Sequence, residues 1–225
     1  MNQPMSIHQQ ALLAIRTLRA ENEALRRAVN EPIAIVATAC RFPGNVTDLD
    51  SYWGMLEQGR DVLEPLPFER WPGLDLQSDD PSRPGRIYAR RGGFLNGFAD
   101  FDPSLFRMSD AEAAALDPQQ RLLIELSWDV LERAGMAPDP DAPPEGPCVG
   151  VFIGLASSGF ARFSMLSGDP TRIDKLSVPG FTPCFASGRL AYLFGFQGPV
   201  MTFDTACSSS LVALHNACVS LRAGE

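Results

Sequence analysis

Cys207 lies where a predicted strand meets a predicted helix, and this position suits a nucleophile. Residues 200–203, Val-Met-Thr-Phe, form a short apolar run of strand-favouring residues behind a proline. After the cysteine, apolar residues recur at a spacing typical of a helix: Leu211, Leu214, Cys218 and Leu221. The free N–H groups and the dipole at the start of a helix favour an anion, so a thiol placed there becomes a better thiolate nucleophile.

The helix that follows Cys207 is predicted to be buried. No formally charged residue occurs between Asp204 and Arg222, and a helix that is apolar on nearly every face belongs inside a protein. Three serines, at positions 208–210, crowd its first turn. Their side-chain oxygens are expected to cap the free N–H groups there.

The position of Cys207 alone leaves a second interpretation open, since free cysteine is among the most buried residue types and usually serves packing. We interpret the other four cysteines, at positions 40, 148, 184 and 218, as buried packing thiols. Five cysteines without close pairs do not suggest a disulfide framework and fit a reducing cytosol. Cys207 and Cys218 are separated by about three helical turns, too far to share a metal, so no metal site is expected.

The residues around Cys207 decide between these interpretations. Residues 204–215, Asp-Thr-Ala-Cys-Ser-Ser-Ser-Leu-Val-Ala-Leu-His, closely resemble the active-site segment of β-ketoacyl synthases, in particular the ketosynthase domains of modular polyketide synthases. In that family the cysteine of Thr-Ala-Cys-Ser-Ser carries the growing acyl chain as a thioester. The resemblance implies that Cys207 is the catalytic residue. A cysteine here, rather than a glutamine, resembles elongating domains more than decarboxylating loading domains.

Further segments resemble the same family in the same order, over about residues 31–225. They are Glu31–Gly44, Arg91–Leu95, Asp117–Leu123, Val149–Gly154, Ala186–Tyr192 and Gly195–Pro199. The resemblance implies a thiolase-like fold, a layered α/β sandwich of which this chain holds only the N-terminal half. It also implies polyketide chain elongation by decarboxylative Claisen condensation, with substrates carried on the phosphopantetheine of an acyl carrier protein and no cofactor bound directly.

The elements that would position Cys207 alternate between strands and helices, which independently favours a layered α/β domain. The periodicity of the apolar residues, with the capping and proline signals, places these elements. They are buried strands over 33–39, 148–155 and 200–203, and helices over 48–58, 110–135 with a break at Pro118, and 185–194. The proline-rich stretch 137–147 is predicted to be a connector.

Residues 1–30 form a separate N-terminal segment ahead of the domain at 31–225. Between Gln9 and Val29 there is no Gly or Pro, and apolar residues dominate heptad positions a and d over about three heptads. The a positions are Ile15, Asn22 and Val29, and the d positions are Ala11, Leu18 and Leu25. This pattern predicts a coiled coil; the alternative is one amphipathic helix packed on its own domain. Because many polyketide synthase subunits begin with such a helix, the resemblance implies a homodimeric docking element for the preceding subunit.

Composition excludes other classes of function. The 225 residues carry a net charge of −8, which argues against nucleic-acid binding. No stretch approaches the length of a membrane span, and the N-terminus lacks a secretory apolar core, so we expect a cytoplasmic protein.

The sequence holds only two histidines, His8 and His215, and neither is expected to touch Cys207. A thiolate in acyl transfer usually needs a base or an electrostatic partner. Related ketosynthases take two histidines and a lysine from the second half of their fold, and no segment here matches those motifs. His215 is expected to be a core histidine. The alternative function is therefore a catalytically inactive docking or dimerisation fragment of a polyketide synthase.

Overall fold

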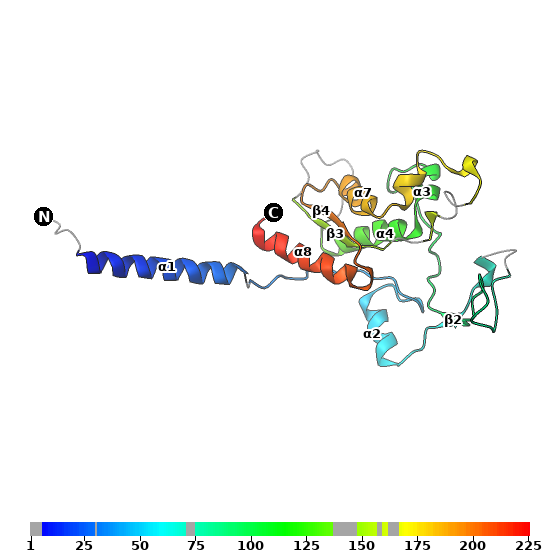
Figure 1. Ribbon diagram of the computed structural model, residues 1–225, viewed down its shortest axis with the longest axis horizontal. Coiled ribbons are helices and arrows are strands. Elements are labelled where there is room, and N and C mark those ends of the chain that lie inside the picture. Colours follow the sequence, from blue (N-terminus) through cyan, green and yellow to red (C-terminus); the bar gives the residue numbers. More distant parts are fainter. Residues whose placement is uncertain (1–5, 30, 71–74, 137–147, 157–158, 162–166) are drawn as a thin grey trace. The chain divides into compact units, whose positions relative to one another are not determined.

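The computed structural model describes all residues except 1–5, 30, 71–74, 137–147, 157–158 and 162–166 (Figure 1). The chain divides into two compact units. The first comprises Met1–Ile35, Ala142–Ala156 and Ser187–Glu225, and the second comprises Val36–Asp141 and Ser157–Ala186. The predicted connector at 137–147 lies outside the described residues.

The first unit is built on two parallel strands, β3 (Val151–Gly154) and β4 (Val200–Phe203). Parallel strands need a crossover connection, and helix α7 (Cys184–Phe194) lies on the route between them in the chain. The Ser187 and Thr202 hydroxyls, 2.7 Å apart, join α7 to β4 by a hydrogen bond. Helix α8 (Ser209–Ala223) packs against both strands (Figure 1).

The predicted bounds of β4 are confirmed, but the predicted burial of β4 and α8 is wrong for this chain. Val200 and Met201 are 40% and 42% exposed. Leu211, Leu214 and Leu221 of α8 are 70%, 59% and 62% exposed. The two strands cover only one side of α8, so the apolar residues on its other sides have no cover among the described residues.

The predicted heptad segment forms a single continuous helix, α1 (Ile7–Val29). Ile15 and Leu18, at predicted a and d positions, are 48% and 62% exposed. In a coiled coil the a and d side chains are buried only when two helices pair, so they are expected to be exposed in a single chain.

The second unit consists of short helices around a small core. Helix α2 (Leu49–Glu57) begins with a capping box, in which Asp48 accepts a hydrogen bond from the Ser51 N–H. The predicted long helix divides at Pro118 as expected, into α3 (Asp110–Ala115) and α4 (Pro118–Arg133). The other elements of this unit are β1 (Glu64–Pro65) paired with β2 (Arg91–Gly92), the 3-10 turns Phe68–Arg70 and Pro170–Arg172, and α6 (Ser177–Phe181).

The core of the second unit centres on the junction between α3 and α4. Leu116, at that junction, is fully buried, and Ile124 of α4 is 1% exposed. Gln120 is buried beside them and donates hydrogen bonds to the Gly180 and Thr182 carbonyls at 3.1 and 3.4 Å. This side chain joins α4 to the end of α6.

The predicted strand over 33–39 is wrong, because residues 31–40 adopt no regular structure. Ile35 and Val36 are 83% and 78% exposed. A strand forms only where a neighbouring strand pairs with its N–H and C=O groups, and no described strand pairs with residues 33–39. None of the helices within the described residues is long and apolar enough to cross a membrane.

Candidate active site

Cys207 is exposed in a short 3-10 turn, Ala206–Ser208, between β4 and α8. The α-helix begins two residues later, so the cysteine precedes the helix rather than belonging to it. The residue before it, Ala206, has φ of 54°. This left-handed conformation costs a non-glycine residue about 1–2 kcal/mol. The chain therefore reaches Cys207 through a strained turn that the surrounding contacts must hold.

The serines brace this turn instead of capping the helix, which corrects the prediction from sequence. Ser208 is the N-cap residue, but its side chain accepts no capping hydrogen bond. Its hydroxyl instead donates to the Thr205 carbonyl at 2.9 Å. The Ser209 hydroxyl accepts from the Thr205 N–H at 2.9 Å and donates to the Ala206 carbonyl at 2.7 Å. These bonds turn back towards β4, because the tight 3-10 geometry brings residues three and four apart into contact.

The Cys207 N–H is available to a ligand. None of the residues that the structure describes accepts a hydrogen bond from it. A backbone N–H beside a nucleophilic sulfur is a suitable donor for an oxyanion formed on an acyl carbonyl. The turn thus presents an exposed thiol and, on the same residue, a backbone N–H without an acceptor among the described residues.

Neither histidine completes the site around Cys207. His215 is exposed on α8, so the expected buried core histidine is not found, and His8 belongs to α1. Within the described ranges, the structure gathers no group of three or more histidine, cysteine or carboxylate residues that could hold a metal ion.

All five cysteines are free, and their exposure differs from the prediction. Cys40 is buried, as expected, but Cys148 and Cys184 are exposed and Cys218 is half-buried. Burial depends on what covers a residue, and the spacing of cysteines in the sequence carries no information about that cover.

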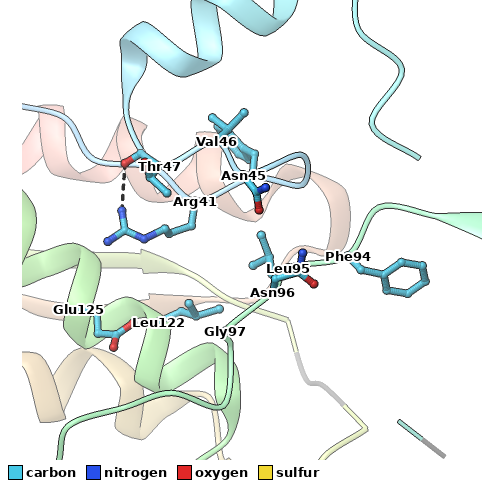
Figure 2. A pocket seen from close by; sticks show the side chains of 11 residues that line it. Arg41, Asn45, Val46, Thr47, Phe94, Leu95, Asn96, Gly97, Leu122 and Glu125 are labelled. Carbon is cyan, nitrogen blue, oxygen red and sulfur yellow. Dashed lines mark hydrogen bonds between the residues drawn. The ribbon is translucent and has the colours of Figure 1, made fainter. Parts of the chain in front are cut away.

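The second unit contains a cavity of about 130 Å³ that the sequence did not indicate (Figure 2). Arg41 donates to the Thr47 carbonyl at 3.0 Å and pairs with Asp129 of α4 at 2.8 Å. Glu125, also on α4, lines the same cavity. Burial is the main cause that raises the pKa of the Glu125 carboxyl; the charge of Asp129 acts in the same direction, and that of Arg41 opposes it. The pair of Arg41 with Asp129 fixes the loop before α2 to α4.

Comparison with known proteins establishes the family. Residues 30–225 match the family described as Beta-ketoacyl synthase, N-terminal domain. The chain therefore belongs to the β-ketoacyl synthase family and forms its N-terminal domain.

Its relatives include modular polyketide synthases. The chain is 46% identical over 216 residues to Mycoketide-CoA synthase from Mycobacterium tuberculosis, covering 96% of this chain and 5% of that protein. It is 48% identical over 208 residues to Spectinabilin polyketide synthase system protein NorC from Streptomyces orinoci, covering 92% of this chain and 9% of that protein. The chain thus spans less than a tenth of the length of these two relatives.

A solved ketosynthase shares the fold. The oxazolomycin ketosynthase domain from Streptomyces albus JA3453 superposes with a TM-score of 0.72 at 37% identity, covering 84% of this chain and 32% of that domain. The fold is accordingly thiolase-like α/β, as the sequence predicted, with the N-terminal helix α1 added.

Proposed function

We propose that this chain is the N-terminal part of a ketosynthase that extends polyketide chains by decarboxylative Claisen condensation, with Cys207 carrying the acyl chain. The observation that carries the proposal is the exposed Cys207 in a braced, strained turn within a domain of this family. In keeping with this role, the domain organisation is a helical segment at 1–30 followed by the ketosynthase domain at 31–225.

The reaction begins with transfer of the acyl group to Cys207. The thiolate attacks the carbonyl carbon of an acyl thioester on the phosphopantetheine of an acyl carrier protein. A new C–S bond forms, and the oxyanion lies against the Cys207 N–H. When the oxyanion collapses to a carbonyl, the C–S bond to phosphopantetheine breaks and phosphopantetheine leaves as a thiolate.

Chain extension follows on the same sulfur. A malonyl-type unit on the carrier protein loses CO₂, and the resulting carbanion attacks the Cys207 thioester. A C–C bond forms and the Cys207 thiolate is released. The proton-transferring groups for this step come from outside this chain, because neither of its two histidines is placed to serve Cys207.

The partners in this proposal are an acyl carrier protein, a second copy of the chain in a homodimer, and a preceding polyketide synthase subunit that docks on residues 1–30. A cytoplasmic location agrees with the five free cysteines. A catalytically inactive docking or dimerisation fragment is the second candidate, favoured by the same shortage of histidines.

The test uses a complete ketosynthase, meaning residues 1–225 joined to a C-terminal ketosynthase domain. Cys207→Ala should abolish loading of a radiolabelled acyl group from its carrier protein. Cys184→Ala is the matched control, since it removes another exposed thiol outside the turn, and Cys218→Ala should also load normally. Undiminished acyl loading of the Cys207→Ala variant would contradict the proposal.

A second measurement separates the two candidate functions. Residues 1–225 alone should form no β-ketoacyl product from loaded carrier proteins, because loss of a general acid–base group typically costs on the order of 10²–10⁴ in rate. Condensation by the complete ketosynthase supports the catalytic role. Its absence there, despite a folded protein, would leave the docking role.

A further inference from the structure

The Ser209 hydroxyl makes two hydrogen bonds to the backbone of the turn around Cys207. Ser209 is 6% exposed. Its hydroxyl contacts one backbone group on each side of the strained residue Ala206: the Thr205 N–H at 2.9 Å and the Ala206 carbonyl at 2.7 Å. The Ser209 N–H also donates to the Ala206 carbonyl. The Ala206 carbonyl is therefore held by two donors of a single residue.

The Ala206 carbonyl and the Cys207 N–H belong to one peptide group. That group is planar and trans, so its C=O and N–H bonds point in opposite directions. Whatever fixes the direction of the carbonyl also fixes the direction of the N–H. By holding the Ala206 carbonyl towards itself, Ser209 directs the Cys207 N–H away from itself, and no described residue accepts a hydrogen bond from that N–H.

We infer that Ser209 is a positioning residue for the oxyanion donor: its hydroxyl orients the Cys207 N–H towards the acyl carbonyl that the cysteine attacks. This inference rests on the proposed function of Cys207. Without the hydroxyl, the Thr205 N–H loses its partner and the left-handed Ala206 loses part of its support, so the peptide group can rotate away from the productive direction.

Two reactions of Cys207 distinguish this role from general structural support. Acylation by a small acyl thioester passes through a tetrahedral oxyanion, so it depends on the donor. Alkylation by iodoacetamide forms an S–C bond and releases iodide without an oxyanion, so it reports only on the thiolate and its access. A loss confined to acylation therefore identifies an orientation effect on the N–H.

The experiment measures both rates at Cys207 in the complete ketosynthase by mass spectrometry of the peptide that contains it. Ser209→Ala should lower the acylation rate about tenfold, which is less than the loss expected on removing a whole oxyanion donor. The alkylation rate should stay within about twofold of the wild type. Ser209→Thr keeps the hydroxyl and should recover acylation. Ser210→Ala is the matched control, because Ser210 is exposed in the next position of α8, and both of its rates should equal those of the wild type.

The possible results separate the inference from the proposed function. Equal acylation by the wild type and Ser209→Ala overturns the inference, as does an equal loss of both reactions or a failure of Ser209→Thr to recover. A wild-type enzyme that is not acylated at Cys207 contradicts the proposed function itself.

Discussion

Gly154, the last residue of β3, lies against the first turn of α8, so that a Cβ built on it would stand 2.5 Å from the backbone nitrogen of Ser210. The same Cβ would be 2.6 Å from the carbonyl carbon of Ser209. Both contacts are with backbone, which cannot rotate out of the way. Glycine at this position is therefore what lets the helix that follows Cys207 pack so closely on the sheet.

Gly154→Ala should destabilise the chain by about 1–3 kcal/mol, because the added methyl group forces α8 away from β3. Urea unfolding followed by circular dichroism measures this as a lower midpoint. Gly188→Ala is the control in the same unit, since beyond its chain neighbours and the nearby backbone of α7 no heavy atom lies within 4 Å of its Cβ position. It should raise stability by roughly 0.5–1 kcal/mol through helix propensity. Equal midpoints for the two variants would contradict the close packing.

Gln120→Leu should lower the stability of the second unit by about 1–2 kcal/mol. The substitution removes the donor to the Gly180 and Thr182 carbonyls, and a buried acceptor without a partner costs the free energy of its desolvation. The Gly180 carbonyl keeps the Asp117 N–H as a donor at 2.8 Å. The loss of stability should therefore lie at the lower end of the usual cost of an unpaired buried acceptor. Gln119→Leu, one residue earlier in α4, should change the unfolding midpoint far less. An equal fall in midpoint for both variants would contradict a stabilising role for the Gln120 hydrogen bonds.

Glu125→Gln should make stability less dependent on pH. Burial raises the folded-state pKa of Glu125 above its ordinary value of 4.5, so the folded protein favours the protonated form. The stabilisation from this group is complete below pH 4.5 and is lost as the pH rises through the folded-state pKa. The amide carries no charge to desolvate, so the variant should melt about 1 °C higher than the wild type at pH 7. The two should melt together below pH 4.5.

Thermal melts at several pH values measure this difference, with Glu132→Gln as the control because Glu132 is exposed on the same helix. A Glu125→Gln variant less stable than the wild type at pH 7 would show that the carboxylate makes a favourable contact in the cavity.

A peptide of residues 1–30 should associate into parallel dimers through the a and d positions of its heptads. Asn22 at an a position favours an in-register pair, and Asn22→Ile should strengthen association while blurring the oligomeric state. So short a seam gives modest affinity. Sedimentation across a concentration series is the measurement. A peptide that stays monomeric at millimolar concentration, alone and with a carrier-protein C-terminal partner, would favour the packed single helix.

Local signals in the sequence predicted most of the helices and the strand β4. The β4 bounds match the expected 200–203, α7 begins one residue early, and the long helix breaks at Pro118. These features depend on neighbours within a few residues. Burial depends on distant cover, so the expected burial of Leu211 and of the strand at 33–39 was wrong.

The turn around Cys207 was predicted only in part. The position between strand and helix followed from the pattern, but the left-handed Ala206 did not, because alanine rarely adopts that conformation. The bonds of Ser209 were also missed. A serine at a helix start can cap or turn back, and only the geometry of the 3-10 turn decides between them.

The apolar face of α8 also bears on how the protein is made. Leu211, Leu214 and Leu221 are all more than half exposed in the folded chain. They are therefore in contact with water as soon as α8 has left the ribosome. Such a nascent chain is a target for chaperones and for association with neighbouring chains on the same message. Chaperone binding and self-association would therefore compete with folding for as long as those leucines stay uncovered.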